Sequence, residues 1–244
     1  MPLVYQHNIN ESTRLAVWHI TEPEAFFLEK VPLKKDVSHP HKRLQHLAGR
    51  YLLPFLFEGF PLEEILVADT RKPFLENEQY HFSISHCGNF AAAIVSSKER
   101  VGIDIELVTA KIERVKHKFT SNYELLFFND EYKAFLEQFG LQEKIEQEFL
   151  TMIWSAKETI FKWYGAGQMD FRRHMQLNGA VHFSEEELIS LPFLFTKNEM
   201  RYFTVHAKMF GSFVLAWLHT RKKLLATSYS LQVWLIQKGV SAFL

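Results

Sequence analysis

The sequence predicts a mixed α+β fold built from antiparallel strands and two long helices. Residues 149–167 place apolar side chains at close to a 3.6-residue period and end on two glycines, as amphipathic helices do. Residues 101–108 alternate with the two-residue period of a strand, so Asp104 and Glu106 share one face and aliphatic side chains share the other. A second long helix is expected from Pro40, because proline is favoured in the first helical turn.

The other expected elements follow the same periodicities. They are a first strand at 14–20, a short helix from about residue 22, strands at 80–84 and 90–96 joined by a polar turn at 85–89, and helices at 112–119, 130–140 and 142–164. We expect the helix from Pro40 to kink or end at Pro54, because proline cannot donate a helical hydrogen bond.

Beyond Gly167 the sequence predicts short strands. These are 169–171, 179–183, 202–208 and 212–219, and the last two form a hairpin around Gly211. Residues 222–244 are expected to form an amphipathic tail, with Leu231, Trp234, Leu235 and Phe243 as its apolar anchors.

Composition narrows the class of protein. The chain has 244 residues, enough for one domain or two small ones, and its 28 basic and 28 acidic residues give no positive excess of the kind that predicts nucleic-acid binding. A hydrophobic fraction of 47% is ample for a core, and the single cysteine, Cys87, excludes an internal disulfide. Neither a membrane span nor a signal pattern is recognisable, so we expect a cytoplasmic protein.

The paired acids Asp104 and Glu106 predict a cation site. Two carboxylates side by side on a strand repel one another unless a cation lies between them. A few carboxylates that leave coordination positions open for substrate phosphates suit Mg²⁺, and Glu158 is the expected third ligand. Glu158 also lies four residues before Lys162, so an ordinary ion pair on a solvated helix face is the alternative.

Four motifs together resemble one family. In chain order they are Lys72-Pro73, Phe82 to His86 (Phe-Ser-Ile-Ser-His), Gly102 to Glu106 (Gly-Ile-Asp-Ile-Glu) and Trp154 to Lys162 (Trp-Ser-Ala-Lys-Glu, then Lys). Their order and spacing resemble those of the 4′-phosphopantetheinyl transferase superfamily. The monomeric, surfactin-synthetase-activating type fits best, and the resemblance spans roughly residues 40–220. The chain departs from the family at Arg71, where the family usually has glycine before Lys-Pro.

The resemblance implies a particular architecture. It is a pseudo-twofold pair of similar α+β halves, each with a long helix packed on a small antiparallel sheet. The N-terminal half would be residues 1–107, with the coenzyme A nucleotide contacts. The C-terminal half would be residues 108–222, with the catalytic helix and the acceptor side, followed by a tail at 223–244.

The resemblance also implies a reaction. The 4′-phosphopantetheine arm of coenzyme A would pass to a serine of an acyl or peptidyl carrier protein with Mg²⁺ as cofactor, releasing adenosine 3′,5′-bisphosphate. Such carriers serve fatty-acid, polyketide or nonribosomal peptide biosynthesis. The expected protein is a monomer that binds neither nucleic acid nor membrane. Two alternatives are a non-catalytic module that binds coenzyme A or a carrier, and another Mg²⁺-dependent phosphoester enzyme.

The resemblance assigns roles to particular residues. The metal ligands would be Asp104, Glu106 and Glu158; the catalytic residues Glu124, Glu158 and Lys162; and the coenzyme A contacts Lys72, Pro73, Ser85, His86, Asp104, Lys162 and Arg43. Lys30 and Lys34 compete with Arg43 for the 3′-phosphate. Glu124 is the expected general base, although it also lies where it would cap a helix with Ser121. Basic residues that could face an acidic carrier, or be plain surface, are Arg172, Arg173, His174 and the segment Lys111 to Lys118.

Overall fold

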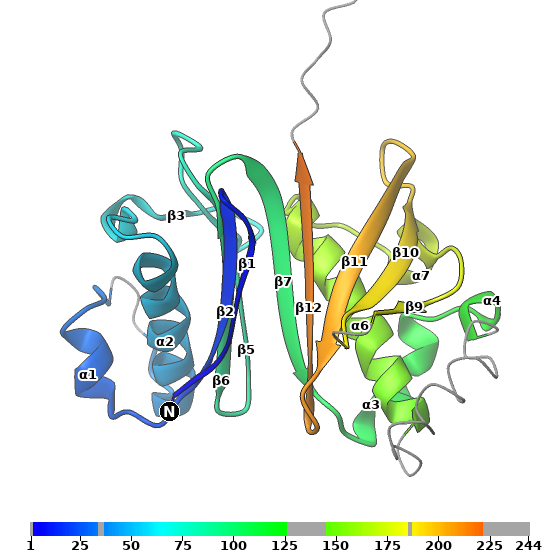
Figure 1. Ribbon diagram of the computed structural model, residues 1–244, viewed down its shortest axis with the longest axis horizontal. Coiled ribbons are helices and arrows are strands. Elements are labelled where there is room, and N and C mark those ends of the chain that lie inside the picture. Colours follow the sequence, from blue (N-terminus) through cyan, green and yellow to red (C-terminus); the bar gives the residue numbers. More distant parts are fainter. Residues whose placement is uncertain (1, 34–36, 126–144, 185–186, 222–244) are drawn as a thin grey trace, which may run out of the picture.

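Two antiparallel sheets pack face to face, and each carries one long helix on its outer side (Figure 1). The computed structural model describes residues 2–33, 37–125, 145–184 and 187–221. From one side to the other the layers are helix α2, the first sheet, the second sheet and helix α6 (Figure 1). The predicted α+β class is therefore confirmed, while the pseudo-twofold relation of the halves stays a prediction.

The first sheet has the strand order β1-β2-β6-β5. Its strands are β1 (Leu3–Asn10), β2 (Thr13–His19), β5 (His81–Cys87) and β6 (Phe90–Ser96). Helix α2 (Pro40–Leu56) begins at Pro40 as predicted and ends two residues after Pro54. Leu47, Leu52 and Ala93 lie in the apolar cluster between this helix and the sheet.

The second sheet has the order β7-β12-β11-β10-β8, and β9 pairs with β10. Its strands are β7 (Glu99–Leu107), β8 (Met175–Leu177), β9 (His182–Phe183), β10 (Ile189–Phe195), β11 (Arg201–Met209) and β12 (Phe213–Arg221). Helix α6 (Ile145–Tyr164) covers this sheet and ends at Gly165, whose φ of 73° is the left-handed conformation of a glycine stop. The hairpin predicted around Gly211 is the β11–β12 connection.

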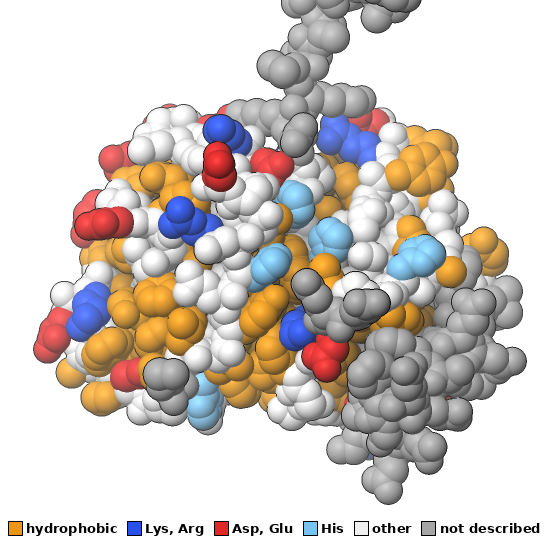
Figure 2. Space-filling view, viewed as in Figure 1, with side chains coloured by type: hydrophobic (Ala, Val, Ile, Leu, Met, Phe, Trp, Pro, Cys, Tyr) orange, Lys and Arg blue, Asp and Glu red, His pale blue; other side chains and the backbone are white. Residues whose placement is uncertain are grey.

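Short elements complete the described chain. They are α1 (Glu24–Leu28), the 3₁₀ helix η1 (Leu62–Glu64), β3 (Leu66–Val67), β4 (Pro73–Phe74), α3 (Lys111–Val115), the 3₁₀ helix η2 (Lys116–Lys118), α4 (Asn122–Leu125) and α7 (Phe171–His174). No helix in the ranges that the structure describes is long and apolar enough to cross a bilayer. The face shown in Figure 2 mixes acidic, basic and apolar side chains, in keeping with the equal numbers of acids and bases.

Several local predictions were wrong. The strand at 14–20 is the second strand, because β1 precedes it. The turn predicted at 85–89 begins later, since β5 runs through Cys87 and places Ser85 and His86 on a strand. Residues 169–171 start helix α7 instead of a strand, because Asp170 accepts hydrogen bonds from the amides of Arg172 and Arg173 as an N-cap. The helix predicted at 130–140 and the tail at 222–244 lie outside the described residues.

An apolar cluster joins the two sheets. Leu15 and Ile94 of the first sheet meet Ile103, Leu215 and Trp217 of the second, and all five are buried. Strand β7 pairs with β12, so by hydrogen bonding the second sheet begins at Glu99. The predicted division of the chain at residue 107 stays a prediction. Although β7 precedes residue 107 in sequence, its strand pairing makes it part of the sheet formed by the C-terminal half.

Strands β5 and β7 lie side by side along the line where the sheets meet. Ser83 Oγ accepts a hydrogen bond from the Ile103 amide at 3.2 Å, and Cys87 Sγ accepts one from the Leu107 amide at 3.4 Å. Side chains of β5 therefore accept hydrogen bonds from backbone amides of β7, where a paired strand would offer backbone carbonyls. This seam places Ser85 opposite Asp104.

Candidate active site

Asp104, Lys162 and Ser85 form a polar triangle where β7, α6 and β5 meet, in which Asp104 and Ser85 are buried and Lys162 is half-buried. Asp104 is 2% exposed, and its Oδ1 lies 2.6 Å from Lys162 Nζ. Ser85 Oγ donates to the same Oδ1 at 2.8 Å and accepts from Lys162 Nζ at 2.8 Å. Lys162 therefore does not pair with Glu158 on a solvated face, but reaches across to the strand carboxylate.

Gly102 explains how the strand and the helix come close enough for this contact. A Cβ atom at Gly102 would lie 2.3 Å from the carbonyl oxygen of Thr159 and 3.0 Å from the Trp163 amide. Only glycine allows this approach of β7 to the backbone of α6. Asp104 follows two residues later on the same strand, and therefore meets the helix face that carries Lys162.

Glu106 lies beside the triangle and is held by two donors. Trp154 Nε1 of α6 donates to Oε1 at 3.1 Å, and Cys87 Sγ donates to Oε2 at 3.6 Å. Burial and the neighbouring Asp104 raise the pKa of the Glu106 carboxyl. Cys87 is thus a packing and hydrogen-bonding residue between β5 and Glu106.

Glu158 completes the set of three acids. Burial is the main cause that raises its pKa to about 7, and repulsion from Asp104 and Glu106 adds to it, while Lys162 opposes the shift. Because both strand carboxylates act on Glu158, the three predicted metal ligands share one electrostatic environment. Lys162 supplies only one positive charge against three acids.

This acid cluster has the donor chemistry of a magnesium site. Asp104 Oδ2 is buried and accepts no hydrogen bond among the described residues, so it is an oxygen ligand without a donor. In the parts of the chain that the structure describes, no three His, Cys, Asp or Glu side chains converge tightly enough to hold a metal ion. The donor set therefore fits Mg²⁺ in kind, and ligation would require the carboxylates to draw together.

His86 lies next to the triangle on β5. The side chain is exposed, yet partial desolvation and the positive charge of Lys162 lower the pKa of the imidazole. His41, in the first turn of α2, lowers the pKa of His86 further and was not among the predicted site residues. No sequence signal links the two, because helix and strand meet only in the folded chain. A lowered pKa keeps His86 neutral near pH 7, when one ring nitrogen can still donate.

Lys72 and Pro73 lie between two cavities. One of about 880 Å³ is lined by Lys72, Pro73 and Arg100 among others, and one of about 210 Å³ by Lys72, Pro73 and Lys162. Lys72 Nζ donates to the Trp163 carbonyl at 3.2 Å, and burial together with Arg100 lowers the lysine pKa to about 8. In this structure the ammonium group therefore contacts the end of α6 in addition to lining both cavities.

Arg71, where the family that the chain resembles usually has glycine, lies in a backbone conformation that favours glycine. Arg71 adopts a φ of 65°, in the left-handed region that glycine enters most easily. A non-glycine residue there costs about 1–2 kcal/mol. The turn before Lys72 thus keeps a glycine-type conformation with an arginine in place.

Two of the three basic residues considered for the 3′-phosphate, Arg43 and Lys30, are engaged elsewhere. Arg43 forms a two-pronged ion pair with Glu24, at 2.8 and 2.9 Å, and donates to the Val37 carbonyl. Lys30 donates to the Phe26 carbonyl and lies over the Phe26 ring. Lys34 lies outside the described residues. Arg43 would have to exchange its carboxylate partner for a phosphate to fulfil the predicted role.

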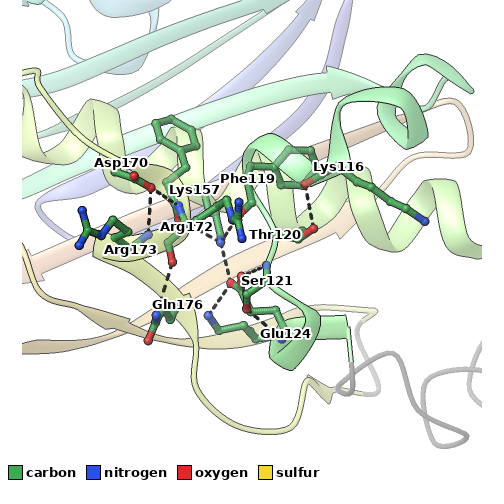
Figure 3. Close-up of polar contacts among 12 residues, drawn as sticks. Lys116, Phe119, Thr120, Ser121, Glu124, Lys157, Asp170, Arg172, Arg173 and Gln176 are labelled. Carbon is green, nitrogen blue, oxygen red and sulfur yellow. Dashed lines mark hydrogen bonds and ion pairs between the residues drawn. The ribbon is translucent and has the colours of Figure 1, made fainter.

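Glu124 forms a capping box, as the alternative interpretation predicted. Its Oε2 accepts from the Ser121 amide at 2.9 Å, while Ser121 Oγ accepts from the Glu124 amide at 3.3 Å. Its Oε1 lies 2.6 Å from Lys157 Nζ and accepts from the Leu177 amide at 2.9 Å (Figure 3). With 1% exposure for Glu124 and 0% for Lys157, this is a buried ion pair. The contacts favour a structural role over the predicted role of general base.

The predicted basic surface lies close to this ion pair. Arg172 and Arg173 are exposed and line a shallow cavity of about 500 Å³ together with Ser121, Asp170 and Gln176 (Figure 3). Lys116 pairs with Glu146 at 2.7 Å. The two arginines are available to an external anion, whereas Lys116 already has a carboxylate partner.

Comparison with known proteins supports the resemblance. Residues 100–218 match the 4′-phosphopantetheinyl transferase superfamily (ACPS). The chain is 29% identical over 134 residues to the 4′-phosphopantetheinyl transferase AcpT of Escherichia coli K12, which is 54% of this chain and 64% of that protein. It is also 31% identical over 122 residues to enterobactin synthase component D of E. coli K12, and 29% identical over 122 residues to that of Salmonella typhi. These matches cover 50% of this chain and 54% and 47% of the two relatives.

The matched segment includes β7 and α6, and with them Asp104, Glu106, Glu158 and Lys162. The chain spans about half to just under two thirds of the length of these curated relatives. The predicted resemblance to the superfamily is confirmed, and the surfactin-synthetase-activating subtype stays a prediction.

Proposed function

We propose that this chain is a 4′-phosphopantetheinyl transferase that moves the phosphopantetheine arm of coenzyme A to a serine of a carrier protein. The observation that supports this most strongly is the convergence of β7 and α6 on the polar triangle of Asp104, Lys162 and Ser85. Both elements lie in the segment that matches the family. We further propose a cytoplasmic monomer of the surfactin-synthetase-activating type.

Mg²⁺ is the cofactor that the acid cluster suits. Asp104, Glu106 and Glu158 would hold the ion, which would neutralise charge on the phosphates of the donor. The raised pKa values of Glu106 and Glu158 support this role, because burial and the neighbouring Asp104 disfavour their ionised forms, which a bound cation would stabilise. The orphan Asp104 Oδ2 supports it independently.

The chain's own side chains would orient the donor. Lys162 can move its ammonium group from Asp104 towards the bridging oxygen of the pyrophosphate and offset the charge that develops there. Neutral His86 can donate a hydrogen bond to a phosphate oxygen. The cavity of about 210 Å³ between Lys162 and the Lys72-Pro73 turn is a fitting place for the nucleotide end.

A proton must leave the acceptor serine during the reaction. The pKa of about 7 belongs to Glu158 in the metal-free site. A carboxylate that also holds Mg²⁺ would be ionised, and an ionised carboxylate can accept a proton as a general base does. Glu124 is less suited, because Lys157 and two amides already occupy its oxygens. We therefore assign the proton transfer to Glu158 and a structural role to Glu124.

The test is to incubate the protein with coenzyme A, Mg²⁺ and an apo-carrier protein and to weigh the carrier by mass spectrometry. A transferase adds the phosphopantetheine arm. A binding module leaves both the carrier and coenzyme A unchanged. A hydrolase degrades coenzyme A and leaves the carrier unmodified. Asp104→Asn should abolish the transfer, whereas the matched change Glu11→Gln in an exposed turn should not.

The same assay separates Glu124 from Glu158. If Glu124 is structural, Glu124→Gln should lower the melting temperature and leave kcat within about twofold at a temperature where it is folded. Replacing a general base should lower kcat of the enzyme by a factor of about 10²–10⁴. We expect a loss of this size for Glu158→Gln. The opposite ranking of the two variants would restore Glu124 as the base.

A further inference from the structure

Three consecutive backbone carbonyls at the end of helix α6 accept hydrogen bonds from side chains of the N-terminal part of the chain. All three donors precede the carbonyl that they contact by more than sixty residues. In order, Trp163 O accepts from Lys72 Nζ at 3.2 Å, Tyr164 O from Arg100 Nη2 at 2.5 Å, and Gly165 O from Thr70 Oγ1 at 2.9 Å. We call Thr70, Lys72 and Arg100 the C-terminal clamp.

The clamp satisfies groups that every helix leaves open. The last four carbonyls of an α-helix have no partner inside the helix, and the partial negative charge of the dipole gathers on them. Lys72 and Arg100 bring positive charge to that end. The fit is close, because a Cβ at Gly165 would lie 2.5 Å from Lys72 Cδ.

Packing holds Arg100 in this position. Its guanidinium lies 5.0 Å from the centre of the Trp163 ring, and the Trp163 indole nitrogen donates to Thr220 Oγ1 at 2.9 Å. The residue is therefore fixed against the side chain of one helical residue and the carbonyl of the next. Two independent contacts define where the helix ends relative to β7.

The clamp acts on the proposed catalytic residues through short covalent paths. Arg100 precedes Asp104 by four residues on β7, and Lys162 directly precedes Trp163 on α6. A slip of α6 along its axis would change the 2.6 Å contact between Lys162 Nζ and Asp104 Oδ1. Holding the end of the helix therefore also holds this contact.

We propose that Thr70, Lys72 and Arg100 are positioning residues that fix α6 along β7 and so place Lys162 and Glu158 against the strand carboxylates. None of the three needs to touch the reacting atoms for this role. The inference deepens the proposed transferase function and relies on it for the kinetic readout. Its structural readout does not need any activity.

The test compares two arginines that make the same kind of contact. Arg100→Gln removes the clamp on α6. Arg14→Gln is the matched control, because Arg14 Nη1 donates to the Leu56 carbonyl at the end of α2 and its guanidinium lies 4.7 Å from the Phe57 ring. Both variants lose an arginine that caps a helix and lies over an aromatic ring. Only Arg100 adjoins the proposed site.

Amide hydrogen exchange without substrate gives the first readout. We expect Arg100→Gln to accelerate exchange at least about tenfold in the last two turns of α6 and Arg14→Gln to leave those amides unchanged. Kinetics give the second: Arg100→Gln should lower kcat about tenfold or more at an unchanged KM for coenzyme A, and Arg100→Lys should recover part of the loss. Thr70→Val is nearly isosteric and should show both the faster exchange in α6 and the lower kcat, each more weakly. It replaces Arg100→Gln in the test if that variant does not fold.

Unchanged exchange in α6 for both Arg100→Gln and Thr70→Val would overturn the clamp. So would a loss of kcat in Arg14→Gln equal to that in Arg100→Gln, because stability alone would then explain it. A wild-type protein without transferase activity would instead refute the proposed function, and the exchange comparison would still decide whether the clamp exists.

Discussion

At the scale of single residues, the proposed site holds three carboxyl groups close together in a largely desolvated environment. Asp104 is 2% exposed, and Glu106 and Glu158 both have raised pKa values that Asp104 helps to cause. Lys162 and Ser85 satisfy one oxygen of Asp104 and leave the other without a donor. Binding sites for cations are built in this way, because the stability lost in the empty site is regained when the ion binds.

The metal-free protein should therefore lose stability as the pH rises through the titration of Glu158. Its pKa is 4.5 unperturbed and about 7 in the folded chain, so between these values the folded state binds more protons than the unfolded state. The free energy of unfolding should fall as the pH rises from about 4.5 to about 7, on the order of 3 kcal/mol in total. Urea titrations at a series of pH values should show this fall.

The matched variant for that experiment is Glu158→Gln, which cannot titrate and should flatten the pH dependence over this window. Adding Mg²⁺ should stabilise the wild-type protein most at the upper end of the range, where the acids are ionised. A wild-type protein whose stability rises from pH 5 to pH 7 without metal would contradict the assigned shift.

At the scale of elements, the glycine of the Gly-Ile-Asp-Ile-Glu motif has a packing role. Gly102 lies where β7 meets α6, and an added Cβ would lie 2.3 Å from the Thr159 carbonyl oxygen and 3.1 Å from Trp163 Cβ. Neither neighbour can rotate away, since the first is helix backbone. Strand and helix must therefore separate to admit even one methyl group.

We expect Gly102→Ala to destabilise the fold by about 1–3 kcal/mol and to reduce transfer more than its loss of stability explains. Gly49→Ala is the comparison, because its added Cβ would lie 2.5 Å from Ile84 Cγ2, a side-chain methyl of β5, and would crowd α2 against the first sheet instead of α6 against β7. Melting curves and kcat for the two variants check this. Equal effects would show that the approach of β7 to α6 is not critical.

The sequence could predict those elements whose side chains repeat regularly. The core of β7, helix α2 from Pro40 and the end of α6 at the glycine stop all followed from periodicity and end signals. Strand β10 was missed because Pro192 interrupts its pattern, although its neighbours β8 and β11 cover it on both sides. Helix α7 was misread because the cap at Asp170 depends on a local turn and not on a repeat.

At the scale of the whole molecule, the site residues were predictable as a set and their partners were not. The motifs indicated Asp104, Glu106, Glu158 and Lys162, and the structure brings β7 and α6 together. The pairing of Arg43 with Glu24, of Glu124 with Lys157 and of Lys72 with the end of α6 joins residues 19 to 91 positions apart. Such contacts depend on how layers stack, which no single stretch of sequence encodes.

The stacking itself predicts how the protein unfolds. Leu15 on β2 and Leu215 on β12 belong to one buried cluster between the sheets, and both are 0% exposed. Separating the sheets would expose this cluster on both sides, so neither half should persist alone. We expect a single unfolding transition in urea, coincident by far-ultraviolet circular dichroism and by tryptophan fluorescence.

Two matched substitutions on opposite sheets turn this expectation into a sharper test. Leu15→Ala and Leu215→Ala should each destabilise the protein by about 2–5 kcal/mol, because each removes buried methyl groups from the same cluster. If the halves unfold together, each variant should shift the whole transition and leave the two probes coincident. If the halves were independent, Leu15→Ala would lower only the part of the transition that belongs to the first sheet and Leu215→Ala only the part that belongs to the second. Since the triangle of Asp104, Lys162 and Ser85 joins β7 and α6 to β5 of the first sheet, independent halves would also mean that the proposed active site can open without unfolding.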